Sequence, residues 1–321
     1  MSFLLRQFSR FAMMLFGVSI LAFGFTEFAY IRHSSFAQTS TLWQHILNYF
    51  HFLSELFHGN FGITQHNAAP VLSTFIHKLP ASIELIIPAI IIAWLVGVPL
   101  ATWAEKKPGG YIDRAVQTIS VAFYSLPVFW LGLILMMVFA TGFELFPVGG
   151  RIDYIYDITP VTGFALIDTL LSDKPYAFEA FIDVIHHLIL PIITLSLLPL
   201  SYVILQLKAG METIHHSEFI MAARSRGMSN TRLLWVHSLP NAIQPVIASM
   251  SLQFSVLITS TIIVEYLFSW PGIGHWFLIL VQQQDFIALR GALMLIATVI
   301  LIANIATDLL RYLTNPKLRR E

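Results

Sequence analysis

Six long apolar segments constrain this chain more than any other feature of its sequence. They cover residues 11–30, 81–104, 115–141, 185–207, 243–266 and 291–312. About 20 apolar residues in a helix span the hydrocarbon core of a bilayer, where only helices and closed barrels satisfy every backbone hydrogen bond. Of the 321 residues, 56% are apolar and 11% are charged, whereas soluble domains carry about 25% charged residues. The sequence therefore predicts an all-α integral membrane protein with six transmembrane helices.

The positive charges are distributed unequally between the two sides of these predicted helices. One side receives thirteen Lys and Arg residues: Arg6, Arg10, Lys106, Lys107, Arg114, Lys208, Arg224, Arg226, Arg232, Arg311, Lys317, Arg319 and Arg320. The other side receives five: Arg32, Lys78, Arg151, Lys174 and Arg290. Because loops rich in Lys and Arg stay in the cytosol, we predict that both chain ends are cytosolic. The first apolar run is long enough to span, so we interpret it as a retained signal anchor.

Several classes of function are excluded by what the sequence lacks. The formal net charge is zero, which gives no argument for nucleic-acid binding. There are no cysteines, so disulfides and thiolate chemistry are excluded. No G-x-x-x-x-G-K-[ST] loop, no G-x-G-x-x-G and no H-E-x-x-H motif occurs. We therefore expect no cofactor, no enzymatic activity and no ATP hydrolysis by the chain itself.

A basic loop, residues 217–245, separates the fourth and fifth apolar segments. Ser217 stands where a helix N-cap is expected, and Glu218 follows in the first turn, where the helix dipole favours a negative charge. Gly227 should end this helix, because glycine adopts left-handed backbone angles at little cost. The positive charges of the loop are Arg224, Arg226 and Arg232. The pattern predicts a short helix in a positively charged cytosolic loop.

Part of this loop resembles the EAA loop of the permease subunits of bacterial ABC importers. The residues that keep the family spacing are Ala222, Ala223, Gly227, Leu239 and Pro240. The chain departs from the family pattern at Met221, which replaces Glu, and at His237, which replaces Ile. Residues 237–242 (HSLPNA) resemble the peptide and nickel branch of that family.

In that family the loop is a coupling helix that docks in a cleft of the ATPase subunit. The resemblance therefore implies a coupling loop here, formed by Glu218, Met221, Ala222, Ala223, Arg224, Arg226, Gly227, Leu239 and Pro240. The alternative is a positively charged cytosolic loop without a partner.

Two further elements resemble the same family. Residues 125–130 (SLPVFW) resemble its S-[IM]-P-x-F-[WV] element, and residues 265–274 (EYLFSWPGIG) resemble its E-x-x-F-x-x-P-G-[LI]-G element. Proline lacks an amide hydrogen and clashes with the preceding turn, so we expect a kink in the first element. In the family the second element shapes the outer end of the translocation path. The residues that we assign to the path or its gate are Pro127, Glu265, Pro271, Gly272 and Gly274.

Three of these interpretations have structural alternatives. The kink at Pro127 forms part of the path in one interpretation and only improves helix packing in the other. Glu265 is costly near membrane depth and should face a cavity or a partner, but it has the alternative of only fixing neighbouring helices. Glu84 lies near the outer end of the segment 81–104. We interpret it as an interfacial carboxylate that caps the helix start, with a group at the outer mouth of the path as the alternative.

The outer segment 142–184 is acidic. Its carboxylates include Asp153, Asp157, Asp168, Asp173, Glu179 and Asp183, opposed by Arg151 and Lys174. Within it, residues 158–175 resemble the corresponding loop of Sap-type peptide permeases. An acidic outer vestibule would attract cationic peptides or polyamines, and we assign this role first to Asp168 and Asp173. The alternative is an ordinary solvated loop.

The outer segment 31–80 holds six histidines: His33, His45, His51, His58, His66 and His77. None of these histidines forms an i, i+4 pair, the spacing that places two ligands on adjacent turns of one helical face. We therefore predict no metal site. Residues 42–56 predict an amphipathic helix that lies on the membrane surface.

The resemblance covers residues 70–318, with weaker support before them. It implies the MetI-like core of type I ABC importer permeases with an extra N-terminal helix. It divides the chain into a transmembrane anchor with a periplasmic segment, 1–70, and a permease domain, 71–318. The implied partners are two ATP-binding cassette subunits that bind the ATP, a second similar permease subunit, and a periplasmic binding protein.

These partners imply a multi-pass protein of the cell inner membrane. We expect ATP-driven alternating access that translocates peptides, including cationic antimicrobial peptides. The alternatives are a permease for a polyamine, haem or nickel, and a membrane scaffold or regulator without transport. Outward transport is also compatible with the sequence.

Overall fold

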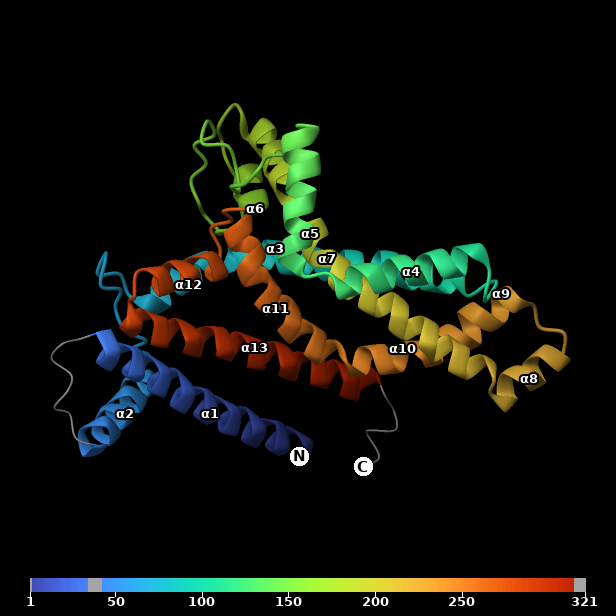
Figure 1. Cartoon of the computed structure of the whole chain (residues 1–321), viewed down its shortest axis with the longest axis horizontal. Coiled ribbons are helices and arrows are strands. Elements are labelled where there is room, and N and C mark those ends of the chain that lie inside the picture. Colours follow the sequence, from blue (N-terminus) through green and yellow to red (C-terminus); the bar gives the residue numbers. More distant parts are fainter. Residues whose placement is uncertain (1, 34–41, 315–321) are drawn as a thin grey trace.

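The computed structural model describes residues 2–33 and 42–314, and its regular elements in these ranges are helices (Figure 1). In chain order they are α1 (Ser2–His33), α2 (Leu42–Phe57), α3 (Val71–Ala104), α4 (Tyr111–Ser125), α5 (Val128–Leu135), α6 (Ala165–Leu170), α7 (Ala177–His215), α8 (Glu218–Ser225), α9 (Asn230–Arg232), α10 (Leu239–Ala248), α11 (Met250–Leu267), α12 (Ile273–Gln282) and α13 (Phe286–Thr314). Two π-helical segments, η2 (Met136–Gly142) and η3 (Leu233–Ser238), continue α5 and join α9 to α10. The all-α prediction is confirmed.

The six predicted membrane segments coincide with four continuous and two broken spans. The helices α1, α3, α7 and α13 are each long and apolar enough to cross a membrane. The first broken span consists of α4 followed by α5 and η2, which are bent by 106° from α4. The second consists of the helical stretch Asn230–Ala248 followed by α11, with a bend of 59° between them. Six spans result when each bent pair counts as one.

Several helices extend beyond the apolar windows that predicted them. The helix α3 begins at Val71 rather than near residue 81, and α7 runs from Ala177 to His215 rather than from 185 to 207. A helix continues as long as its backbone hydrogen bonds do, whereas hydropathy marks only the apolar part of it. The short helix α12, between the fifth and sixth spans, was not predicted.

The contact between α3 and α7 forms the centre of the molecule (Figure 1). Small buried residues recur at every fourth position of α3 from Ala89 through Ala93 and Gly97 to Ala101, and Leu85 and Ala81 continue the same buried face. A methyl group added at Gly97 would lie 3.0 Å from Val203 of α7. Small side chains let helix backbones approach closely, which gives membrane helices their van der Waals contact.

The first two helices lie at the edge of this core. Figure 1 shows α1 running antiparallel to α13. Gln7 donates a 2.9 Å hydrogen bond to Asp308 near one end of this pair, and Arg290 lies over the ring of Phe23 towards the other. The helix α2 packs on α1 through a stacked Phe23–Phe52 pair. The N-terminal helix, which the resemblance implies in addition to the core, thus lies at the edge of the core, and the helix predicted over 42–56 is confirmed.

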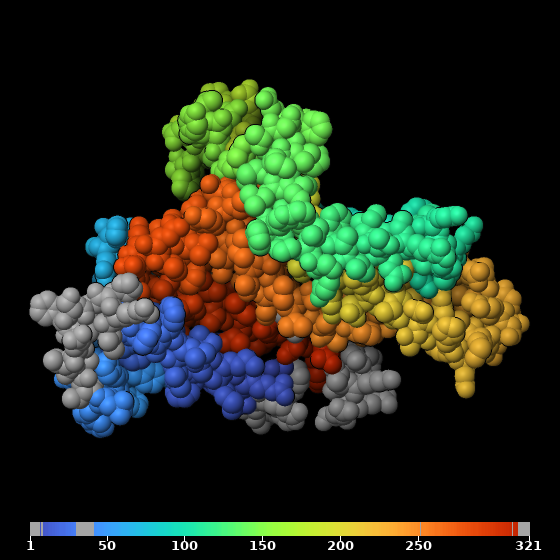
Figure 2. All heavy atoms as spheres, viewed as in Figure 1, coloured from blue at the N-terminus to red at the C-terminus, as the bar shows by residue number. Residues whose placement is uncertain are grey.

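The segments that carry the predicted site residues include two parts that project from the body of the molecule. Figure 2 shows the green stretch that includes η2 and α6 as a lobe standing out from the body, and α8 and α9 as a tip at the far right. The permease domain predicted over 71–318 begins where α3 begins, at Val71. Its predicted end lies outside the described residues, and the division into two domains stays a prediction.

Candidate functional site

The predicted coupling loop folds into a short helix with a defined end. Gly227 has φ +81° and donates to Arg224 O at 3.0 Å, while Met228 donates to Ala223 O at 3.4 Å. This pair of bonds is the Schellman arrangement, which requires a left-handed residue where glycine stands. The predicted end of the helix is therefore confirmed. Ser217 is at the N-cap position, but its hydroxyl donates to Ile214 O at 2.5 Å instead of capping α8.

One side chain anchors α8 and its neighbours face outward. Ile220 is fully buried, whereas Phe219 is 47% and Met221 is 52% exposed. Trp235 and Val236 of η3 add exposed apolar surface nearby in the chain. Of the other predicted coupling residues, those exposed are Glu218, Ala222, Arg224, Arg226, Gly227 and Pro240, and those half-buried are Ala223 and Leu239. The tip of the molecule thus presents apolar and cationic groups together.

Behind α8 a cavity of about 650 Å³ separates it from the ends of α3, α4 and α7, and Met221 and Arg224 form part of its wall. Lys208 of α7 forms an ion pair with Asp113 of α4 there. Burial, together with the charge of Asp113, raises the pKa of Glu105 just beyond α3. These polar contacts join α7, which leads into α8, to the α3–α4 turn.

The carboxylate of Glu265, in the second predicted path element, is fully buried. It accepts hydrogen bonds from the backbone N–H of Gly274 at 2.6 Å and of His275 at 3.1 Å. Ser82 of α3 donates to it at 2.5 Å and accepts from Ile273 N at 2.9 Å. The unpaired N–H groups of the first turn of α12 are thereby satisfied, and a carboxylate stands at the positive end of the α12 dipole.

Two positions of this element have room only for glycine, because other parts of the chain approach their backbone closely. A methyl group at Gly272 would lie 2.4 Å from the carboxylate of Glu265, and one at Gly274 would lie 2.3 Å from Cα of Ile262. The second obstacle is backbone, which cannot move aside as a side-chain tip can. Pro271 is exposed beside them. Three of the five predicted path residues therefore lie in contact with one another. They are Glu265, Gly272 and Gly274.

Pro127 breaks its helix completely rather than kinking it. Leu126 and Pro127 both adopt extended backbone angles, with ψ of 137° and 135°. Proline drives the residue before it out of the helical region, and α5 restarts at Val128. The break lets α5 pack against α11, where a methyl group at Gly132 would lie 2.6 Å from Leu267. The first path element therefore contacts the span that carries the second.

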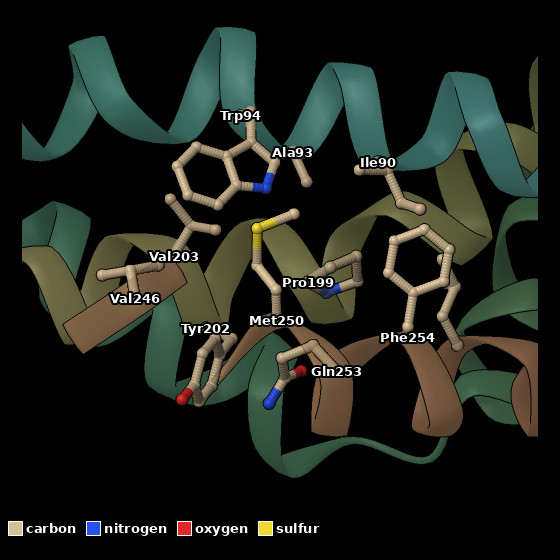
Figure 3. A pocket seen from close by; sticks show the side chains of 11 residues that line it. Ile90, Ala93, Trp94, Pro199, Tyr202, Val203, Val246, Met250, Gln253 and Phe254 are labelled. Atoms are coloured by element: carbon tan, nitrogen blue, oxygen red, sulfur yellow. The ribbon is translucent and has the colours of Figure 1, made fainter. Parts of the chain in front are cut away.

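The fifth span breaks at Ser249, where α10 ends and α11 begins at the next residue. Figure 3 shows the side chain of Met250 directed towards Trp94, with Pro199 beside it. These residues line a small cavity of about 30 Å³, where the side-chain oxygen of Gln253 is buried and has no hydrogen-bond partner among the described residues. The sequence has no proline or glycine at this break, so no local signal predicts it.

Glu84 is an ion-pair partner deep in α3, and the prediction that it caps the helix start was wrong. Arg151 of the outer segment donates to it at 2.9 Å and 2.5 Å, and Leu166 N donates at 3.3 Å. Arg151 also donates to Gly163 O at 2.6 Å and lies 5.9 Å from the ring centroid of Trp270. The outer segment is thus bound to α3 and to the α11–α12 turn at one point.

The two acidic residues chosen for cargo attraction lie in different surroundings. Asp168 is buried and accepts from Thr162 N and Oγ1, both at 2.7 Å, and from Gly163 N at 3.0 Å. Burial raises the pKa of Asp168, but these hydrogen bonds outweigh it and hold the pKa below its usual range. Asp168 thus closes the turn before α6 and does not face solvent, whereas Asp173 is exposed.

Sequence reasoning missed Ser82 and Arg151 as members of the outer contact. Arg151 had a usable signal, because it is one of two cations in an acidic segment and its pairing with a carboxylate at membrane depth is expected. Ser82 had none, since Ser in a membrane helix usually bonds its own backbone. Among the described residues, no three His, Asp or Glu side chains come close enough to hold a metal ion.

Residues 97–320 match the family model described as binding-protein-dependent transport system inner membrane component. The di/tripeptide transport system permease protein DppB of Pseudomonas aeruginosa is 37% identical over 280 residues, 87% of this chain and 82% of the relative. The peptide transport system permease protein SapB of Salmonella typhimurium is 33% identical over 319 residues, 99% of this chain and 98% of the relative. The putrescine export system permease protein SapB of Escherichia coli K12 is 34% identical over 302 residues, 94% and 93% of the two chains.

Proposed function

Because this chain belongs to the family of binding-protein-dependent transport system inner membrane components, we propose that it is the permease subunit of an ATP-driven peptide transporter. Cationic antimicrobial peptides are included in the proposed cargo. The chain itself is not an enzyme in this proposal, because ATP is bound and hydrolysed by two separate ATPase subunits. A second permease subunit and a periplasmic binding protein complete the transporter, and both termini of this chain are cytosolic.

The observation that carries the proposal is the geometry of α8 and its loop. Ile220 anchors the helix in the body, while Phe219 and Met221 stay exposed. Burying exposed apolar surface stabilises an interface by about 25 cal/mol per Å². An ATPase that covers this tip therefore gains apolar contact with Met221, the residue that replaces the Glu of the family pattern. The exposed Arg224 and Arg226 add positive charge at its rim.

Movement of α8 has a direct route into the bundle. The helix follows the long helix α7 after two residues and also contacts η3, which leads into the broken fifth span. Rocking of packed helices about a few break points is an established form of conformational change in transporters. In the proposed mechanism, ATP-driven closure of the ATPases moves α8, and the breaks at Pro127 and Ser249 absorb the change that alternates access.

A polyamine is the second candidate cargo, because one relative carries a putrescine export name. The exposed carboxylates of the outer segment include Asp173, Asp157 and Glu179, and a concentration of negative charge attracts either kind of cation through space. Both cargo classes therefore share this part of the proposal, and haem and nickel lack a comparable observation.

The test is transport by the reconstituted complex. Proteoliposomes with both permease subunits, the ATPases and the binding protein should accumulate labelled peptide only when ATP is supplied. Met221→Arg should lower uptake at least tenfold, because it places a charge in the apolar dock, without changing the stability of the isolated chain. Tyr111→Arg is the matched control, since Tyr111 is 93% exposed at the start of α4 and belongs neither to the coupling loop nor to the acidic outer segment.

Two outcomes would contradict parts of this proposal. Full uptake by Met221→Arg would remove α8 from the ATPase interface. Movement of putrescine without movement of peptide would transfer the cargo assignment to polyamines and leave the coupling assignment intact.

A further inference from the structure

A polar cavity lies between the peripheral helices α1 and α2 and the core helix α13. It has a volume of about 420 Å³ and is walled by α2, the turn 60–62 and the first turns of α13, with one residue from α1. Figure 1 shows α1, α2 and α13 meeting in this part of the molecule, away from α8. The transport mechanism uses none of the side chains that line it.

The distinctive group in this cavity is the guanidinium of Arg290. It lies over the ring of Phe52 at 4.5 Å and over the ring of Phe23 at 5.2 Å. Within residues 2–33 and 42–314 it forms no hydrogen bond and no ion pair within 4.0 Å, although the negative charge of Glu27 acts on it at longer range. Aromatic faces stabilise the planar cation while leaving the N–H groups at its edge unused. Arg290 is therefore held rigidly and offers a fork of donors suited to a phosphate.

Two carboxylates share the same cavity. Glu27 of α1 is paired with His45 at 3.1 Å, and Glu55 of α2 accepts a hydrogen bond from Asn60. Each retains oxygen lone pairs for a further donor, because a carboxylate accepts about four hydrogen bonds. With two acids to one guanidinium, the cavity disfavours a purely anionic ligand. It suits a zwitterion that places a phosphate at Arg290 and an ammonium at Glu55.

Apolar surface flanks this polar cavity on two helices. On α1, Leu21, Phe25 and Phe28 are exposed. On α2, the polar face towards the cavity includes Asn48, His51 and Glu55. The exposed apolar residues of the same helix are Leu42, Trp43, Ile46, Leu47, Phe50 and Phe57. An amphipathic helix with this division lies at the boundary between headgroups and acyl chains. A ligand in the cavity can therefore extend hydrocarbon along α1 and α2.

We propose that this cavity binds the headgroup of an ethanolamine phospholipid. The phosphate accepts hydrogen bonds from Arg290, and the primary ammonium donates to Glu55 and Glu27. The bound lipid joins α1 and α2 to α13 at the outer face of the membrane. A zwitterionic peptide shares the charge pattern but has no acyl chains to cover the adjoining apolar surface.

The experiment measures lipid binding to the full, delipidated chain in detergent by native mass spectrometry. Dioleoyl phosphatidylethanolamine should bind at least tenfold more tightly than the corresponding phosphatidylglycerol or phosphatidylcholine. Phosphatidylglycerol has no ammonium group, and the quaternary ammonium of phosphatidylcholine has no N–H donors. Arg290→Gln should weaken ethanolamine lipid binding at least tenfold. Glu55→Gln should reduce the preference for ethanolamine over glycerol lipid at least fivefold, because the amide has no negative charge to attract the ammonium.

Lys174→Gln and Glu144→Gln are the matched controls, since both residues are exposed on the outer segment, and neither should alter lipid binding. Equal binding of the three lipids to the wild-type chain overturns the proposal. An unchanged lipid preference in a folded Glu55→Gln variant overturns it as well. Soluble glycerophosphoethanolamine or a dipeptide that binds as tightly as the lipid would assign the cavity to a soluble zwitterion. Displacement of the lipid by the second permease subunit would assign it to a subunit interface. Either of these results also overturns the lipid assignment.

Discussion

Ser82 donates a 2.5 Å hydrogen bond to the carboxylate of Glu265, although 183 residues separate them in the chain. The same hydroxyl accepts from Ile273 N, so one small side chain joins α3, α11 and the start of α12. The element resembling a family motif is thereby held to the central helix. The helix α12 can therefore move relative to α3 only if this contact breaks.

Removing the Ser82 hydroxyl should destabilise this junction. Ser82→Ala deletes a hydrogen bond to a buried carboxylate and leaves Ile273 N without its acceptor. A hydrogen bond to a charged group contributes about 1.5–3 kcal/mol, so we expect a loss of this size in the free energy of unfolding. SDS titration followed by tryptophan fluorescence measures it. Ser73→Ala is the control, because Ser73 is exposed on the same helix, and equal stability of the two variants would contradict the prediction.

Adding one methyl group at Gly274 should disrupt the contact between α11 and α12. The new Cβ would lie 2.3 Å from Cα of Ile262, so α12 has to shift away from α11 and lose the hydrogen bonds to Glu265. We expect Gly274→Ala to abolish ATP-dependent uptake and to broaden the size-exclusion profile. Gly24→Ala should retain uptake, since nothing lies within 4 Å of a Cβ there and alanine favours a helix by about 1 kcal/mol.

The Arg151–Glu84 pair should show strong energetic coupling. Its side chains are only 18% and 5% exposed, and breaking a buried pair from one side costs about 3–5 kcal/mol because the remaining charge is unpaired. In a double-mutant cycle, Arg151→Gln with Glu84→Gln should be less destabilising than the sum of the single changes. The exposed Lys174–Asp157 pair, at 3.7 Å with side chains 46% and 87% exposed, should couple by less than about 1 kcal/mol. Additive single changes at Arg151 and Glu84 would refute the coupling.

The turn closed by Asp168 should loosen in acid. The folded state holds the pKa of Asp168 below its usual range, so the ionised carboxylate stabilises the folded turn. That contribution is complete above the unfolded pKa of about 3.9 and is lost as the pH falls below it towards the folded value. Hydrogen exchange of the Thr162 and Gly163 amides, corrected for intrinsic rates, should accelerate over this range. Asp168→Asn should remove the pH-dependent acceleration, and an unchanged profile would contradict the assignment.

Much of the architecture follows from local sequence patterns. Runs of apolar residues are sufficient to predict six spans, because a chain in a bilayer has to satisfy its backbone within each helix. Gly227 predicts the end of α8, since only its own backbone angles decide that turn. Pro127 predicts a distortion, although the full break also requires α7 and α11 to provide a surface on which α5 packs.

The sequence by itself therefore determined which segments span, where α8 ends and which family the motifs resemble, all of them properties of residues within a few turns of one another. Only the tertiary structure decided that Glu84 pairs with Arg151, that Asp168 is buried, and that Glu265 bonds Ser82 and the first turn of α12. A carboxylate in an apolar segment requires a partner, but its partner is chosen by the packing of helices far apart in the chain. That choice depends on backbone approach at positions such as Gly274, which periodicity and composition do not encode.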